Sequence, residues 1–250
     1  MKDQMRVTGI VLSVFPIGEN DRRLTILTKE RGKIQVFARG CRKPNHPLFG
    51  VTQPLIYCEF MITEGRTSSY LNSAEGRDYF PWLKSDLDQI YYSTYFAELA
   101  EYFTVEGMDE RNTLNLLFVT FRAMGQEKVS LPLIRRIFEY RILQYYGIGL
   151  EVFRCLSCSG EDQTHTLSIE NGGVFCDDCH GKIRDVYFHS VNLTPAVLYA
   201  LQYVSSVPLT RLYSFNLSDE VFADFSWIVK HFLRLHVDHS FKSAEMLDML

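Results

Sequence analysis

Hydrophobic and polar residues alternate in short runs over the first 75 residues, and this pattern predicts β-strands. The runs are rich in β-branched and aromatic residues, and turn-forming residues separate them. Five short strands are too few for a sandwich but match the five-stranded barrel of an OB fold. We therefore predict an OB-type barrel over residues 1–80, with an SH3-like barrel as the alternative. The predicted strands cover residues 7–14, 24–28, 33–38, 55–62 and 69–74.

The pattern changes after Pro81-Trp82, where apolar residues begin to recur at steps of three and four. This spacing is typical of helices with one buried face, so the aromatic residues on it are expected in the core. Pro132 and Thr194-Pro195 are typical of first turns of helices. We predict an α-helical domain in two parts, residues 81–150 and 189–250. Its helices are expected at 87–103, 114–124, 130–147, 196–203 and 221–235.

Four cysteines form two C-x-x-C pairs that seventeen residues separate, Cys155 with Cys158 and Cys176 with Cys179. Two pairs at this distance supply four soft thiolates to one tetrahedral zinc ion. Between them, Asn171-Gly172 lies between two strand-like runs and predicts a hairpin. We therefore predict that a zinc-ribbon-like module over residues 151–188 interrupts the helical domain and holds one Zn²⁺ per chain.

The predicted zinc is structural, because four thiolates leave no position for an activated water. A zinc deaminase would need an H-x-E element and a proline before its second C-x-x-C, but Leu167 and Phe175 occupy those positions. A dithiol redox centre is a weaker alternative. Phosphate-loop, dinucleotide-binding, zinc-protease and serine-hydrolase motifs are absent from the sequence. We therefore predict that the protein is not an enzyme, and that Cys41 and Cys58 are small core residues.

Charge is unevenly distributed along the chain. The formal net charge is −4, but the first 50 residues carry ten Lys and Arg against four Asp and Glu. Their balance of +6 leaves −10 on the rest, which favours a surface for a polyanion on the barrel over a merely solvated basic face. Phe37 and Tyr57 could stack on bases, but we expect them in the core. The predicted DNA contacts, at strand ends and in turns, are Arg22, Arg23, Lys33, Arg39, Arg42 and Lys43.

No apolar run reaches the roughly 18 residues that a membrane span needs, and the first residues lack the apolar core of a signal peptide. We therefore expect a cytoplasmic protein without membrane contact. Thiols stay reduced in that compartment, which favours metal ligation over disulfides for the paired cysteines.

The order of these parts resembles the RecO family of bacterial recombination mediators over nearly the whole chain. The resemblance is carried by Gly18-Glu-Asn-Asp21, by Leu24-Thr-Ile-Leu-Thr28 and by Gly32-Lys33 with the basic segment Gly40-Cys-Arg-Lys-Pro44. A helical region with a four-cysteine module inside it is also the layout of that family. One departure is Cys41, where a small residue such as alanine is expected.

The resemblance implies a function in DNA repair and recombination. A member of this family is expected to bind single- and double-stranded DNA with an OB fold and to anneal complementary strands. It is also expected to help load the RecA recombinase onto DNA coated by single-stranded DNA-binding protein. Implied partners are RecR and the acidic, apolar C-terminal tail of the coating protein, at the bacterial nucleoid. Arg135 and Arg136 are candidate contacts for that tail.

Two other functions remain open at this point. A zinc-ribbon protein that binds RNA or takes part in transcription would share the cysteines and the basic segment, but would prefer structured RNA to single-stranded DNA. A metalloenzyme would need an open zinc position, so removing one cysteine would abolish turnover rather than folding.

Overall fold

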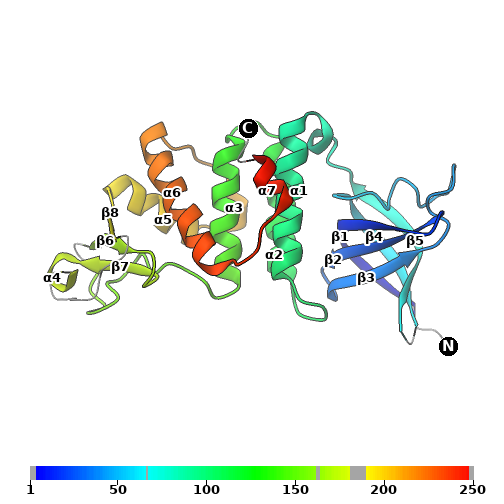
Figure 1. The fold of residues 1–250 in the computed structure, drawn as a ribbon, viewed down its shortest axis with the longest axis horizontal. Coiled ribbons are helices and arrows are strands. Elements are labelled where there is room, and N and C mark those ends of the chain that lie inside the picture. Colours follow the sequence, from blue (N-terminus) through cyan, green and yellow to red (C-terminus); the bar gives the residue numbers. More distant parts are fainter. Residues whose placement is uncertain (1–3, 66, 162–163, 181–189, 248–250) are drawn as a thin grey trace. The chain divides into compact units, whose positions relative to one another are not determined.

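The computed structural model describes residues 4–65, 67–161, 164–180 and 190–247 (Figure 1). Gly181 and the rest of the predicted cysteine module, to residue 188, lie outside these ranges. The chain divides into two compact units, one of Met1–Gln126 with Ser240–Leu250 and one of Glu127–His239. The helical region is thus shared between the units, while the predicted boundaries at residues 80, 150 and 188 stay predictions.

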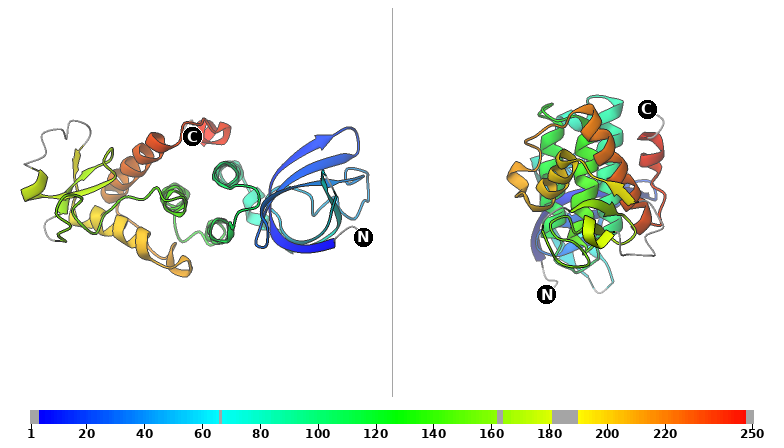
Figure 2. Two further views of the ribbon diagram at one scale, coloured as in Figure 1. Left: turned by 90° about the horizontal axis from the view of Figure 1, so that it is seen from below. Right: turned by 90° about the vertical axis from the view of Figure 1, so that its left-hand side faces the viewer.

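The first unit begins with a closed barrel of five strands (Figure 2). Neighbouring strands follow the order β1-β2-β3-β5-β4, and β1 also pairs with β4. β3 and β5 run parallel, whereas the other pairs are antiparallel. This confirms the predicted five-stranded OB-type barrel. The strands are β1 (Gln4–Ile17), β2 (Asp21–Thr28), β3 (Gly32–Ala38), β4 (Tyr57–Glu64) and β5 (Ser69–Asp78).

Alternate residues of each strand fill the barrel, as the period of two along a strand requires. Val36 and Phe60 are completely buried there, and Cys41 and Cys58 lie in the same apolar cluster. Burial raises the pKa of the Cys58 thiol to about 12, so it stays neutral. The prediction that these two cysteines are core residues is confirmed.

Helices of the first unit pack beside the barrel. Asp86 caps the first long helix by accepting a 2.9 Å hydrogen bond from the Gln89 N–H. Gly32 has φ +62°, and a Cβ there would lie 2.1 Å from the Met108 carbonyl oxygen, so only glycine lets the β2–β3 turn meet the α1–α2 loop. The helical elements are η1 (Pro81–Lys84), α1 (Leu87–Phe103), α2 (Arg111–Met124) and α7 (Lys242–Leu247).

The short helix α7 was not predicted, because six residues carry too little periodicity to detect. It packs on α1, where the Ser243 N–H and hydroxyl both donate to the Glu98 carboxylate. Phe241 also contacts the Tyr95 ring edge-on, with the ring centroids 5.9 Å apart. The C-terminal residues thereby join the first unit, although α6 before them belongs to the second.

The second unit contains three longer helices and a small sheet. Thr194 caps α5 by accepting a hydrogen bond from the Val197 N–H, as its sequence predicts. Among the described residues no helix is long and apolar enough to cross a membrane. The helices are α3 (Leu131–Tyr145), α4 (Asp177–His180), α5 (Pro195–Ser206), η2 (Leu209–Arg211) and α6 (Asp219–His236). The strands, in the order β7-β6-β8, are β6 (Thr164–Ser168), β7 (Gly173–Cys176) and β8 (Ser190–Asn192).

Candidate metal centre and nucleic-acid interface

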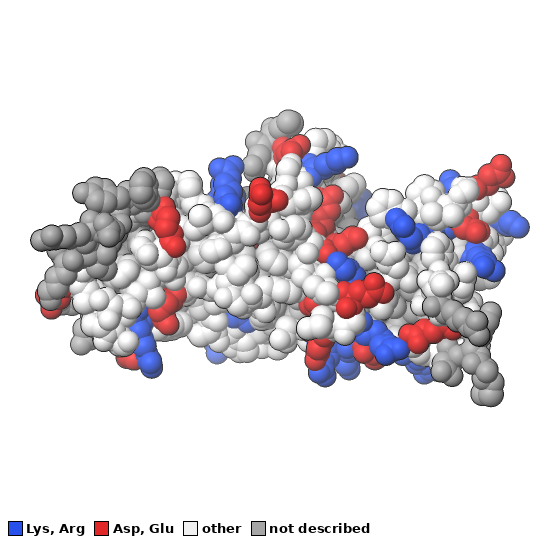
Figure 3. All heavy atoms as spheres, turned by 60° about the horizontal axis from the view of Figure 1, so that its bottom comes forward, with Lys and Arg blue, Asp and Glu red and all other residues white. Residues whose placement is uncertain are grey.

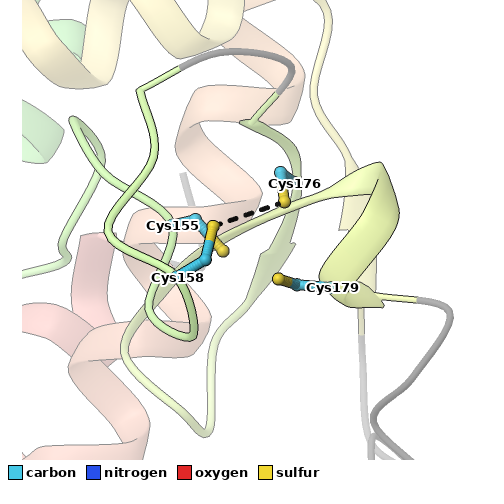
Figure 4. A group of neighbouring side chains, drawn as sticks. All are labelled: Cys155, Cys158, Cys176 and Cys179. Atoms are coloured by element: carbon cyan, nitrogen blue, oxygen red, sulfur yellow. Dashed lines mark hydrogen bonds between the residues drawn. The ribbon is translucent and has the colours of Figure 1, made fainter.

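The four paired cysteines come together from three segments of the second unit (Figure 4). Cys155 and Cys158 lie on the loop before β6, Cys176 ends β7, and Cys179 lies in α4. The loop is tied to the sheet because the Leu156 N–H donates to the Val174 carbonyl at 2.9 Å. The predicted hairpin of β6 and β7 thus places the two C-x-x-C pairs opposite each other.

The sulfur atoms of these cysteines all lie within 4.8 Å of one another, and those of Cys158 and Cys176 are 3.8 Å apart. A tetrahedral zinc with Zn–S bonds of about 2.3 Å has sulfur atoms about 3.8 Å apart. All six cysteines of the chain are free thiols. Among the residues that the structure describes, this is the one group of three or more His, Cys, Asp or Glu side chains that could hold a metal ion.

The thiols affect one another's ionisation. Burial disfavours the Cys155 thiolate, but backbone N–H groups of Cys176, Cys158 and residue 157 donate to the sulfur and lower its pKa to about 6. The Cys179 N–H lowers the pKa of Cys176, but burial and the neighbouring thiols outweigh it and raise that pKa to about 12. The Cys155 thiolate therefore forms readily, and the Cys176 thiol needs a bound cation to ionise beside it.

Three of the six predicted DNA contacts donate hydrogen bonds to backbone carbonyls of the protein itself. The Arg22 guanidinium donates to the Phe49 carbonyl at 3.1 Å and to the Thr52 hydroxyl at 2.7 Å. Lys33 donates to the Glu101 carbonyl at 2.6 Å. Arg42 joins two loops by donating to the Gly18 carbonyl at 3.1 Å. Hydrogen bonds to carbonyls leave the positive charges in place, but they fix the side chains.

The other three predicted contacts, Arg23, Arg39 and Lys43, form no ion pair with a carboxylate in the described parts of the chain. Arg23 lies over the Phe15 ring, with its Cζ atom 5.2 Å from the ring centroid. Arg39 lies over the Tyr70 ring at 4.4 Å. Two arginines thus contact aromatic faces without losing their charge.

Sequence reasoning placed Phe37 and Tyr57 in the core, and for Phe37 this is wrong. Its neighbours Val36 and Ala38 both point into the barrel, so Phe37 faces outward, half-buried, with its ring centroid 6.1 Å from that of Tyr70. Tyr57 packs edge-on against Phe118 of α2. Alternation along a strand shows which residues share a face, but both faces of β3 carry apolar residues.

The outward residues of four strands line up in register. Phe15 of β1 is opposite Arg23 of β2, Arg23 is opposite Phe37 of β3, and Phe37 is opposite Tyr70 of β5. We call these four residues, with Arg39 over Tyr70, the aromatic–arginine row. This row could not be predicted from the sequence, because it requires the pairing of strands that lie far apart along the chain.

Other arginines of the barrel are neutralised by carboxylates. On β1, β4 and β5, Glu59 pairs with Arg6 at 3.2 Å and with Arg77 at 3.1 Å. Arg31 pairs with Glu64 at 2.7 Å. On the face drawn in Figure 3, Lys and Arg side chains lie among Asp and Glu side chains. Of the ten Lys and Arg in the first 50 residues, Arg6 and Arg31 are neutralised in this way.

Arg135 and Arg136, the candidate tail contacts, lie on α3 with 7% and 8% of their surface exposed. Both pair with the fully buried Glu139, at 2.9 and 2.6 Å, and Arg136 also donates to the Ser226 hydroxyl of α6. The two ion pairs lie within α3, and the bond to Ser226 joins α3 to α6 within the second unit. The arrangement gives both arginines a structural role and leaves little of either for a partner.

Comparison with known proteins agrees with the order of the parts. The model of "Recombination protein O N terminal" matches residues 1–80, and that of "Recombination protein O C terminal" matches residues 84–245. The "DNA repair protein RecO" of Alkaliphilus metalliredigens is 28% identical over 97% of this chain and 98% of the relative. That of Desulforudis audaxviator is 34% identical over 72% of each chain. The barrel, the helices, the clustered cysteines and these matches together show that the chain belongs to the RecO family.

Proposed function

We propose that this protein is a DNA-binding recombination mediator that binds single and double strands through its barrel and anneals complementary strands. Membership of the RecO family supports a role in DNA repair and recombination. The observation that carries the proposal is the set of unpaired cations Arg23, Arg39 and Lys43. Arg23 lies over the exposed Phe15 ring and Arg39 over the half-buried Tyr70 ring. Such a combination suits a charged backbone with bases attached.

Annealing needs no catalytic residue. Two complementary strands repel each other through their phosphates, and a basic surface that binds both lowers this repulsion, so that base pairing drives the reaction. With three to six phosphates contacted, the affinity for single strands should fall with salt at a log–log slope between about −2 and −4. The protein is in this view a mediator and not an enzyme.

We assign a structural Zn²⁺ to the cysteine cluster. Cys155, Cys158, Cys176 and Cys179 offer four thiolates at the spacing of a tetrahedral site, and no further position for water. The ion would neutralise the thiolates and hold the loop, β7 and α4 together. One ion per chain is expected in freshly purified reduced protein.

As a family member, the protein is expected to work at the nucleoid with RecR and to help load RecA onto strands coated by single-stranded DNA-binding protein. For the acidic, apolar tail of the coating protein, we propose a groove between α5 and α6. Its cavity of about 460 Å³ is lined by Tyr199, Tyr203, Phe215 and Val221. Arg211 also lines it and would bind a carboxylate of the tail. Arg211→Glu should weaken binding of a tail peptide at least tenfold, whereas Arg234→Glu, an exposed α6 control, should not.

The decisive experiment measures annealing of complementary DNA strands coated with the cognate single-stranded DNA-binding protein. The wild-type protein should accelerate annealing, and Arg39→Glu with Lys43→Glu should remove most of the acceleration while the protein stays folded. Arg77→Glu is the matched control, because Glu59 already neutralises Arg77. No acceleration by the wild-type protein, together with tighter binding to structured RNA, would support a zinc-ribbon RNA-binding protein instead.

A further inference from the structure

The aromatic–arginine row presents apolar rings on the outside of a barrel whose core is already filled. Phe15 has 48% of its surface exposed, and Ile17, two residues further along β1, has 39% exposed. Phe37 and Tyr70 are half-buried. Exposed apolar groups that lie together in this way mark binding surfaces.

Across β1, β2, β3 and β5 the row consists of a ring, a guanidinium group and two neighbouring rings. Adjacent strands are about 4.8 Å apart, so the row extends roughly 14 Å across the sheet. Phe37 and Tyr70 are tilted by 38° to each other, and Arg39 extends the row over the Tyr70 ring. Aromatic rings and planar guanidinium groups are the side chains on which nucleic-acid bases stack.

We infer that the aromatic–arginine row is a stacking platform for unpaired bases and that it makes the barrel discriminate single from double strands. This rests on the proposed function, because it assigns a specificity to the same DNA-binding barrel. The cations Arg23, Arg39 and Lys43 would attract any phosphate backbone. The rings of Phe15, Phe37 and Tyr70 would add affinity only where base faces are accessible.

Base pairing decides which part of the surface a DNA molecule can use. In a duplex, each base face is covered by the next base pair, so that only base edges, sugars and phosphates face the protein. In a single strand, the base faces are free to leave their neighbours and stack on protein rings. The rings therefore raise the affinity for single strands over that for duplexes, whereas the charges raise the affinity for both.

The test compares the wild-type protein with a double variant that carries both Phe37→Thr and Tyr70→Thr. Threonine suits a strand, keeps the charge unchanged and removes both rings. Affinity is measured for a thymidine oligonucleotide and for a duplex of equal length, each at several salt concentrations. The variant should lose at least tenfold in affinity for the single strand and less than twofold for the duplex. Its salt slope should equal that of the wild-type protein, because no phosphate contact is removed.

Two controls separate stacking from unfolding. Trp227→Ala removes an exposed aromatic ring from α6 in the second unit and should change neither affinity. A single 2-aminopurine in the oligonucleotide should lose fluorescence on binding the wild-type protein, and lose clearly less with the double variant, because stacking quenches this base. Unchanged melting of the barrel shows that the variant is folded.

The outcomes distinguish this inference from the proposed function. If the wild-type protein binds neither DNA, the proposed function is wrong. If it binds both, but the double variant keeps its affinity for the single strand or loses equally for both, the row is not a stacking platform although the barrel binds DNA. If the double variant loses affinity only for the single strand and quenches 2-aminopurine less, the row is a stacking platform.

Discussion

The barrel and the cysteine module of this protein are stabilised by different means. The barrel encloses a continuous apolar cluster in which Val11, Leu24, Ile26 and Phe60 are completely buried. In the module, Cys155 and Cys176 are themselves part of a buried cluster with Phe175, and Cys179 packs against it. Leu167 and Val174 of the hairpin are also completely buried. A fold with three short strands has a small core, so a metal ion held by the cysteines would add to its stability.

Because of this difference, we expect the residues that bind DNA and the residues that stabilise the cysteine module to lie in different regions. The barrel can expose aromatic rings and unpaired arginines because its inward residues suffice to hold it. In the module, the four cysteines lie at the spacing of a closed four-thiolate metal site, which would have no position for a further ligand. We expect metal removal to affect the module alone, and substitutions on the outer barrel surface to affect DNA binding alone.

The largest effect is expected from Cys176→Ala. Loss of one thiolate should lower metal content to below one tenth and open the module, because zinc binding and folding of such modules are coupled. Metal analysis and amide hydrogen exchange measure this, with exchange in β6 and β7 expected to rise at least a hundredfold. Cys58→Ala is the matched control, a buried thiol outside the cluster, and should leave the metal bound. Retained metal in Cys176→Ala would contradict the assignment.

Phe60→Ala should destabilise the barrel and leave the cysteine module unchanged. Removing a completely buried ring from the barrel should cost about 3–5 kcal/mol of its free energy of unfolding. Denaturant unfolding followed by hydrogen exchange in β1 and β4 would measure the loss. The metal content should stay at that of the wild-type protein. Metal loss in this variant would show that the two regions do not fold independently.

Acidification should release the metal before the barrel unfolds. The pKa of Cys155 is lowered from 9.0 to about 6, so its stabilising contribution is complete above about pH 9 and is lost as the pH falls through about 6. The Cys58 thiol, with its pKa raised to about 12, stays neutral throughout this range. A chromogenic chelator should report metal release between pH 7 and 5. The prediction would be contradicted if the metal were released only at the pH at which the barrel unfolds.

The smallest effect is expected from single arginines on the barrel. Arg39→Gln should make the salt slope for single strands shallower by about 0.7, the contribution of one phosphate contact. Arg77→Gln should leave the slope unchanged, because Glu59 and Glu75 already neutralise Arg77. Chelated protein should show the wild-type slope. A slope that changes on chelation would place part of the DNA site on the cysteine module.

Much of the fold follows from local sequence. The strands of the barrel, the long helices and the cysteine hairpin are each encoded by period, capping residue or turn, as Asp86, Thr194 and Asn171-Gly172 illustrate. The sequence also predicted that the two C-x-x-C pairs lie close together, because the hairpin between them reverses the direction of the chain. The elements α4, α7 and β8 are too short for such signals.

The candidate DNA surface could be predicted only in part. The sequence identified basic residues of the barrel, but Arg22, Lys33 and Arg42 bind carbonyls of other segments while Arg23 and Arg39 contact rings. Arg135 and Arg136, the candidate contacts for the partner tail, pair with the buried carboxylate of Glu139.

By itself, the sequence determined the five strands, the helical region, the clustering of the four cysteines and the basic character of the barrel, because each depends on residues close together in the chain. Only the tertiary structure decided which cations stay unpaired and that Phe15, Arg23, Phe37 and Tyr70 form one row. The physical reason is strand register. A shift of one residue between two strands would turn the same side chains to opposite faces of the barrel, and register depends on contacts between distant segments.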